Sequence, residues 1–290
     1  MANLKKAKSK NFILVTGCGG FIGFHLALHL LKKNFSVIGI DNLNNYYSKK
    51  LKIDRVKELK KFASKKNKKF YFFKFDLSNN KKLQKIFQKK QINKVVHLAA
   101  QAGVRYSLIQ PEKYFTNNLL SFFNILEACK DNKIKKLIFA SSSSVYGNSK
   151  KFKFSEKDST DYPIQFYAAT KKSNEVMAHA YSSLYKFKCF GLRFFTVYGP
   201  WGRPDMSIFM FTKNILENKK IKVFNKGKHS RDFTYVDDIC ESIYRLLNIK
   251  GNKIKENFKI FNIGSSNPYK LKYLIQSIEK LLEKKLKKNF

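Results

Sequence analysis

The sequence predicts an α/β fold with a doubly wound parallel sheet and a smaller C-terminal lobe. Three observations lead to this prediction. Short runs rich in β-branched and aromatic residues alternate with stretches of helical period. Several runs are apolar at every position, as expected for strands buried on both faces of a parallel sheet. A glycine-rich turn joins the first run to the first helical stretch.

The predicted strands of the regular part of the chain are 11–17, 36–41, 69–77, 94–100, 135–143 and 188–195. The helical stretches between them lie near 20–33, 48–64, 79–90, 110–131 and 164–186. This alternation is typical of βαβ units, in which a helix connects one parallel strand to the next. After residue 200 the pattern is less regular, with a strand at 258–263 and helices near 206–218, 236–248 and 270–285.

The chain has 290 residues, 43% of them hydrophobic, which suffices for one large domain with an appended lobe. We expect the sheet domain to comprise residues 11–190 together with 233–264. The smaller lobe would comprise 191–232 together with 265–290, and residues 1–10 would form a basic N-terminal tail.

The net charge of +39 comes almost entirely from lysine, because only six of the 59 basic residues are arginines. The lysines are spread along the whole chain between apolar positions, which is typical of a solvated surface. No combination of basic and aromatic residues resembles an RNA-recognition module. Nucleic-acid binding is therefore not the expected function, and polyanion binding is kept only as an alternative.

The four cysteines, Cys18, Cys129, Cys189 and Cys240, are far apart and form no CxxC pair. We therefore expect reduced thiols in a cytoplasmic protein, and no metal site. No apolar run reaches the roughly 18 residues that a membrane-spanning helix requires, so no membrane partner is expected.

The first predicted strand runs directly into the turn "GCGGFIG" and then into a helix. Gly17, Gly20 and Gly23 have the spacing that lets the backbone approach a pyrophosphate at a helix N-terminus. Phe21 and Ile22 lie in the same turn. The sequence therefore predicts that a dinucleotide binds here, with its phosphates against the start of the helix.

A carboxylate at the end of the second strand indicates which dinucleotide is expected. Asp41 can accept hydrogen bonds from the adenosine ribose, and its charge would repel the 2′-phosphate of NADP. NAD is therefore the predicted cofactor. Further candidate cofactor-binding residues follow the second predicted strand or end the third and fourth: Asn42, Asp76, Leu77, Ala99 and Ala100. Asp76 could equally cap the helix that follows it.

Tyr167 and Lys171 are four residues apart in a predicted helix and so lie on one face of it. A phenol has an ordinary pKa of about 10 and is a poor base at neutral pH. A lysine ammonium beside it and an oxidised nicotinamide would both favour the phenolate. A serine of the preceding "SSSSVYG" stretch could share the proton path. His97 lies inside an apolar strand and is expected to be a core residue.

Together, "TGCGGFIG", Asp41, "HLAA", "SSSSVYG" and "YAATK" resemble the extended short-chain dehydrogenase/reductase family in its nucleotide-sugar branch. The resemblance implies a Rossmann-type domain, a substrate-binding C-terminal lobe and NAD. It implies that Ser142 is the catalytic serine, Tyr167 the base, and Lys171 the residue that tunes Tyr167 and binds the NAD ribose. It also implies that Ser144 contacts the sugar, that a 4-keto sugar forms, and that this sugar takes hydride back on its other face.

The stretch "FFTVYGPWGRPDM" resembles the corresponding segment of the UDP-glucuronate 4-epimerases. The resemblance implies that Thr196 and Arg203 contact the sugar carboxylate. A second stretch, "HSRDFTYVDDI", resembles the nucleotide-clamping segment of the family and implies that Arg231 contacts the substrate diphosphate. A guanidinium suits both groups, because it forms charge-assisted and bidentate hydrogen bonds with carboxylate and phosphate. We therefore expect a UDP-sugar substrate, with UDP-glucuronate and UDP-galacturonate interconverted at C4 in polysaccharide biosynthesis.

Other functions remain as alternatives. A UDP-glucose/UDP-galactose 4-epimerase is the nearest, and a UDP-glucuronate decarboxylase is less favoured because its loop pattern differs. A 4,6-dehydratase is disfavoured, because those enzymes carry an Asp-Glu pair where this chain has Ser143 and Ser144. A non-catalytic NAD- or polyanion-binding protein is disfavoured by the intact Ser142, Tyr167 and Lys171.

The resemblance also bears on assembly and on the end of the chain. It allows a homodimer formed through the helices near 110–131 and 164–186. It implies a further segment after residue 290, with a Pro-Gly-Asp turn that helps to close the uridine pocket. We therefore expect this chain to be C-terminally short.

Overall fold

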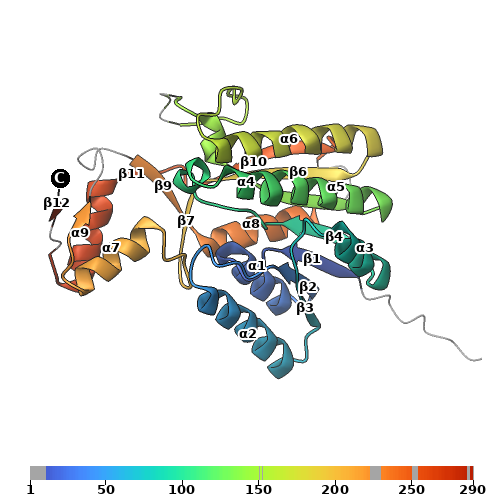
Figure 1. The fold of residues 1–290 in the computed structure, drawn as a ribbon, viewed down its shortest axis with the longest axis horizontal. Coiled ribbons are helices and arrows are strands. Elements are labelled where there is room, and N and C mark those ends of the chain that lie inside the picture. The colour runs from blue at the N-terminus through green and yellow to red at the C-terminus, as the bar shows by residue number, and fades with distance from the viewer. Residues whose placement is uncertain are drawn as a thin grey trace, which may run out of the picture.

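The computed structural model describes residues 11–149, 151, 153–222, 230–249, 254–285 and 288–289. It confirms the predicted α/β fold, with a seven-stranded sheet between two layers of helices and a smaller lobe beside it (Figure 1). The strands of the sheet are β1 (Phe12–Thr16), β2 (Ser36–Asp41), β3 (Phe70–Lys74), β4 (Ile92–His97), β5 (Lys136–Ser142), β6 (Lys188–Phe194) and β10 (Phe258–Ile263). The predicted basic tail, 1–10, lies outside the described residues.

The order of the strands across the sheet is β10-β6-β5-β4-β1-β2-β3, and every neighbouring pair is parallel. The chain builds outward from β1 in one direction to β3, then crosses back to β4 on the other side of β1. The crossovers therefore diverge between β1 and β4. In open parallel sheets, the carboxyl ends of the strands at such a point form the usual ligand-binding crevice.

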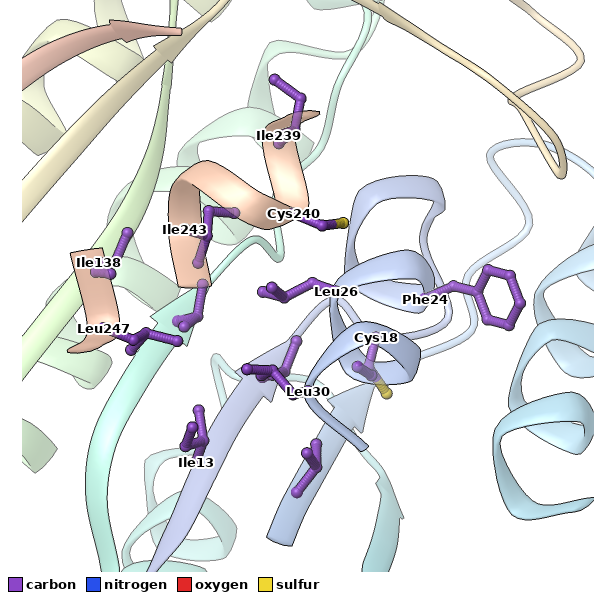
Figure 2. Close-up of a cluster of buried hydrophobic side chains, with 14 of the residues drawn as sticks. Ile13, Cys18, Phe24, Leu26, Leu30, Ile138, Ile239, Cys240, Ile243 and Leu247 are labelled. Carbon is purple, nitrogen blue, oxygen red and sulfur yellow. The ribbon is translucent and has the colours of Figure 1, made fainter. Parts of the chain in front are cut away.

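Both faces of the sheet are buried, because successive residues of one strand belong to different apolar clusters. Ile13 and Val15 pack with α1 (Phe21–Lys32), α2 (Lys49–Lys65) and α8 (Val236–Asn248). Figure 2 shows this cluster, with Leu26 and Leu30 of α1 beside Ile243 of α8. Phe12 and Leu14 point to the opposite side. They pack with α3 (Asn80–Lys89), α5 (Ser121–Asp131) and α6 (Phe166–Tyr185). This two-sided burial explains why several of the strands are continuous apolar runs.

Local capping fixes where two of these helices begin. The side chain of Ser48 accepts a hydrogen bond from the backbone N–H of Leu51 at the start of α2. The side chain of Asn79 does the same for Lys82 at the start of α3. Each cap satisfies a backbone donor that has no partner within its own helix.

The predicted helix at 110–131 is divided in the structure. It consists of α4 (Pro111–Tyr114), a π-helical segment, η2 (Phe115–Leu120), and then α5. Short 3₁₀ turns, η1 (Arg105–Leu108) and η3 (Ser143–Tyr146), occupy two of the loops. Apolar periodicity does not distinguish a π-helical turn from an α-helical one, which is why the sequence predicts a continuous helix.

The smaller lobe contains a sheet that the sequence does not predict. Its strands are β7 (Thr196–Tyr198), β9 (Ser230–Tyr235) and β11 (Pro268–Lys270), in the order β11-β9-β7. Two helices, α7 (Ser207–Leu216) and α9 (Leu271–Leu282), pack through Phe211, Ile215, Ile275 and Ile278. A further pair, β8 (Ile221–Lys222) with β12 (Lys288–Asn289), lies near the C-terminus. Strands of two or three residues are too short to show a period of two.

The boundaries of the predicted domains lie a few residues from those of the sheets. β6 stays in the large sheet as far as Phe194, so the boundary expected at residue 190 falls within a strand. β9 belongs to the small sheet up to Tyr235, so the boundary expected at residue 233 also falls within a strand. The division into two parts stays a prediction. Among the described residues, no helix is long and apolar enough to cross a bilayer.

Candidate active site

A cavity of about 1370 Å³, including its solvent-open part, lies at the carboxyl ends of the strands. Every residue predicted to bind the cofactor lines it: Gly17, Gly20, Phe21, Ile22, Gly23, Asp41, Asn42, Asp76, Leu77, Ala99, Ala100 and Lys171. Ser142, Tyr167 and Arg203 line the same cavity. The glycine turn, the Tyr–Lys pair and the loop between β7 and α7, which carries Arg203, thus line one cavity.

The glycine turn is too tight for side chains. Gly17 has a φ of +70°, and a Cβ atom there would lie 2.7 Å from the backbone nitrogen of Ala99. A Cβ atom at Gly23 would lie 2.1 Å from the carbonyl oxygen of Gly17. No acidic residue occupies the first turn of α1, whose N-terminal N–H groups begin after Gly20. This arrangement fits the phosphates of a dinucleotide, since the helix start supplies free donors and a positive dipole end.

Asp41 is held by the turn that it faces. Its Oδ2 atom accepts a hydrogen bond from the backbone of Gly19 at 3.0 Å, and its Oδ1 atom accepts one from Leu43 at 2.7 Å. A carboxylate has about four acceptor positions, so capacity remains for two ribose hydroxyls. Burial raises the pKa of Asp41 above its usual range, against the opposing effects of these hydrogen bonds and of Lys52.

Asp76 joins the ends of β2 and β3. Its carboxylate accepts hydrogen bonds from the side chain of Asn42 at 2.7 Å and from the backbone of Ser78 at 2.9 Å. Burial would raise the pKa of Asp76, but these hydrogen bonds outweigh it and lower the pKa. The alternative role as a helix cap is wrong, because Asn79 caps α3.

His97 is a core residue, as its position predicts. It is buried, and its Nδ1 atom lies 2.9 Å from the hydroxyl oxygen of Thr16. The same hydroxyl oxygen accepts a hydrogen bond from the backbone N–H of Ala99. Burial, with a smaller effect of the charge of Lys171, lowers the pKa of His97 to about 3. His97 therefore stays neutral and fixes the wall of the cavity.

The Tyr–Lys pair occupies the first two turns of α6, and Ser142 ends β5 beside it. Burial raises the pKa of Tyr167, while a hydrogen bond with Ser142 and the positive charge of Arg203 lower it. Lys171 is buried and donates to the carbonyl oxygen of Ala140 at 2.9 Å. Burial lowers the pKa of Lys171 to about 8, although the charge of Glu175 opposes this shift. The tuning of Tyr167 by Lys171 stays a prediction.

A buried ion pair supports the strand that carries the serines. Arg193 donates to both carboxylate oxygens of Glu175, at 2.9 and 2.8 Å, and to the hydroxyl oxygen of Tyr146. Glu175 also accepts a hydrogen bond from Ser141, the neighbour of Ser142. This pairing gives Tyr146 a structural role. The ion pair itself was not predicted, because no sequence pattern shows that Arg193 and Glu175 meet.

Three predicted substrate residues do not line the cavity. Ser144 lies behind Ser142, with 3.2 Å between the two hydroxyl oxygens. Thr196 begins β7, where it pairs with Phe233. Arg231 is exposed on β9 and donates to the carbonyl oxygen of Ser230. Their substrate contacts stay predictions.

Arg55 is a site residue that the sequence analysis missed. It is fully buried, and its guanidinium donates to the carbonyl oxygens of Gly19, Trp201 and Gly202 and to the hydroxyl of Tyr47. Among the described residues, no carboxylate forms an ion pair with it. Arg55 therefore joins the glycine turn to the loop that precedes Arg203. One sequence feature could have indicated its burial, namely its position on the same face of α2 as the buried residues Val56, Leu59 and Ala63.

Comparison with known proteins relates this cavity to sugar-nucleotide enzymes. The profile of the "NAD dependent epimerase/dehydratase family" matches residues 13–264. Protein CapI of Staphylococcus aureus is 48% identical over 96% of this chain and 85% of its own length. UDP-glucuronate 4-epimerase 4 of Arabidopsis thaliana is 42% identical over 96% of this chain and 65% of its own length. The UDP-glucuronic acid 4-epimerase of Bacillus cereus, crystallised with UDP-glucuronic acid and NAD, is 38% identical. Its TM-score is 0.88, over 96% of this chain and 85% of that one.

We expect Arg55→Met to destabilise the protein. The substitution removes the donor for three backbone carbonyls, so the free energy of unfolding should fall by about 1–3 kcal/mol. The measurement is equilibrium unfolding in urea. Arg245→Met is the matched control, because Arg245 is 76% exposed and pairs with Glu241 on the surface of α8. Equal midpoints for the two variants would contradict a supporting role for Arg55.

Proposed function

The chain belongs to the NAD-dependent epimerase/dehydratase family, and we propose that it interconverts UDP-glucuronate and UDP-galacturonate at C4. The observation that carries this proposal is the cavity itself. Tyr167 and Ser142 line it beside the glycine turn, and Arg203 lines it from the loop between β7 and α7. Residues suited to proton transfer, to binding a dinucleotide and to binding a carboxylate thus line the same cavity. Related UDP-glucuronate 4-epimerases support the same substrate.

In the proposed reaction, Tyr167 accepts the proton of the sugar 4-hydroxyl and later returns it. Ser142 hydrogen-bonds to Tyr167 and so holds the path along which the proton moves. NAD, when bound, supplies a reversible hydride acceptor for C4 of the sugar. The glycine turn and Asp41 would hold its phosphates and ribose, and Lys171 its second ribose. The positive charge of Arg203 favours the phenolate of Tyr167.

Arg203 is the proposed basis for choosing a uronate over a neutral hexose. A C6 carboxylate in this cavity needs charge-assisted hydrogen bonds, which a guanidinium supplies in a fixed plane. A neutral sugar gains nothing comparable from the same group. Firm hold of the carboxylate would also protect the 4-keto uronate, a β-keto acid, from losing CO₂. Thr196 would add a hydroxyl to this contact, and Arg231 would bind the substrate diphosphate.

We also propose that two chains associate through α5 and α6. Phe115, Phe123, Val176 and Leu184 project from η2, α5 and α6 with 42–70% of their surface exposed. The rings of Phe123 on α5 and Tyr181 on α6 are 6.5 Å apart, so the two helices contact each other beside these side chains. Exposed apolar patches of this kind mark protein interfaces.

A cytoplasmic location stays a prediction. All four cysteines are buried and unpaired, as is usual in a compartment that keeps thiols reduced.

We expect Tyr167→Phe to lower kcat for UDP-glucuronate by about 10²–10⁴-fold, because the proton acceptor is lost. NAD binding should be retained, since the glycine turn and Asp41 are unchanged. Steady-state kinetics and NAD titration check the two parts. Tyr273→Phe is the control, because Tyr273 is exposed on α9, away from the cavity. Turnover by Tyr167→Phe at the rate of this control would reject the assignment.

Arg203→Ala tests the substrate. Loss of charge-assisted hydrogen bonds should raise KM for UDP-glucuronate by about 10- to 100-fold. The inhibition constant of UDP-glucose should change little, because UDP-glucose has no carboxylate. NMR of wild-type reactions with each sugar identifies the C4 epimer or any pentose. Conversion of UDP-glucose but not UDP-glucuronate, or equal losses for both sugars in Arg203→Ala, would favour the neutral UDP-hexose 4-epimerase instead.

For the proposed dimer, we expect Val176→Glu to give monomers, because it places a charge within the apolar face. Light scattering coupled to gel filtration measures the mass. Leu281→Glu, at an 83% exposed position of α9, should leave the dimer intact. A monomeric wild-type protein, or a dimeric Val176→Glu variant, would show that this face is not the interface.

A further inference from the structure

Arg203 is already paired with a carboxylate of its own loop. Its Nε atom donates to Oδ1 of Asp205 at 3.0 Å, and its Nη2 atom donates to Oδ2. This is the bidentate geometry in which a guanidinium and a carboxylate bind most strongly. One complete edge of Arg203 is therefore occupied before any substrate carboxylate arrives.

The other edge of Arg203 is available. Within the part of the chain that the structure describes, its Nη1 atom donates no hydrogen bond, although the side chain is only 19% exposed and lines the cavity. Asp205 offsets part of the positive charge of Arg203. Recognition of a substrate carboxylate at this point would therefore depend on directed N–H groups as well as on charge.

Tyr46 holds Asp205 from the other side. Its hydroxyl donates to Oδ2 of Asp205 at 3.1 Å, and its ring lies 5.7 Å from the guanidinium carbon of Arg203. Burial and the charge of Asp205 raise the pKa of Tyr46 to about 12. Burial would raise the pKa of Asp205, but the hydrogen bond and charge of Arg203 together with the hydrogen bond of Tyr46 lower it. Tyr46 thus stays a donor and Asp205 an acceptor at neutral pH.

The backbone near Tyr46 makes room for its hydroxyl. Gly103 has a φ of +99°, and a Cβ atom there would lie 2.1 Å from the hydroxyl oxygen of Tyr46. The hydroxyl of Tyr114 donates to the carbonyl oxygens of Ala102 and Gly103, which fixes this segment. Tyr46, Gly103 and Asp205, which are far apart in the sequence, therefore lie close together. The contacts that hold Asp205 against Arg203 thus come from the packing of three segments of the chain.

We propose that Asp205 is a positioning residue for uronate recognition, because it fixes Arg203 with its Nη1 edge turned toward the sugar carboxylate. Tyr46 supports Asp205 in this role. The inference rests on the proposed function, since it specifies how the same cavity binds the C6 carboxylate of the sugar. A fixed guanidinium loses less side-chain entropy on binding than a mobile one, so affinity depends on Asp205 although Asp205 repels the substrate.

The opposite hypothesis is that Asp205 competes with the substrate carboxylate for Arg203. The two hypotheses predict opposite changes in the affinity for UDP-glucuronate when Asp205 is neutralised. If Asp205 positions Arg203, its neutralisation weakens the binding of UDP-glucuronate. If Asp205 competes, its neutralisation strengthens that binding. A merely structural role would affect UDP-glucuronate and UDP-glucose alike.

The test is calorimetric titration of NAD-loaded wild-type protein, Asp205→Asn and Tyr46→Phe with each sugar nucleotide, together with steady-state kinetics. We expect Asp205→Asn to weaken UDP-glucuronate binding about tenfold, as for one freed side chain. KM should rise accordingly, kcat should change less, and UDP-glucose binding should stay within about twofold. Asp131→Asn is the control, because Asp131 pairs with Lys130 at the end of α5.

Tyr46→Phe distinguishes support of Asp205 from direct contact with the sugar. It should weaken UDP-glucuronate binding in the wild-type background and have little further effect in Asp205→Asn. Tighter binding by Asp205→Asn, equal losses for both sugars, or full additivity with Tyr46→Phe would each overturn the inference. Failure of wild-type protein to convert UDP-glucuronate would instead reject the proposed function, and the calorimetric comparison would still test Asp205.

Discussion

The hydrogen bonds of the buried Arg55 are the constraint on which the rest of the site depends. One guanidinium holds a carbonyl of the glycine turn and two carbonyls of the loop before Arg203. The dinucleotide site belongs to the large sheet, whereas Arg203 belongs to the entrance of the small lobe. Because Arg55 bonds to both, one residue of α2 fixes the glycine turn relative to the loop that carries Arg203. The guanidinium reaches these acceptors from two separate nitrogens, Nη1 toward the glycine turn and Nη2 toward the loop before Arg203.

Much of the architecture is predictable because it is local in sequence. The strands of the large sheet alternate with helices in register with the apolar pattern, and α8 (Val236–Asn248) has the bounds that its periodicity indicates. The glycine turn and the pair of Tyr167 and Lys171 are contiguous motifs with fixed spacing. Each motif follows a predicted strand, so its place at the carboxyl edge of the sheet follows from parallel topology. The cavity lining agrees with this expectation for the whole cofactor set.

What the sequence does not show is which distant polar groups meet. Arg193 and Glu175 look like ordinary charges of a strand and a helix, yet they form a buried pair behind the serines. Arg203 is readable as a loop arginine, but its pairing with Asp205 and Tyr46 depends on three segments packed together. The strands of the small sheet are too short for a periodic signal. Arg231 is a different case. Its motif predicts a contact with the substrate diphosphate, but its side chain lies outside the described cavity.

In the proposed reaction, one cavity oxidises and reduces C4 of a uronate without exchanging hydrogen with solvent. UDP-glucuronate that carries deuterium at C4 tests this, with the product followed by NMR. We expect UDP-galacturonate that retains deuterium at C4, because hydride is returned to the sugar from which it came. A product with solvent-derived hydrogen at C4, or a UDP-pentose formed by loss of CO₂, would contradict it.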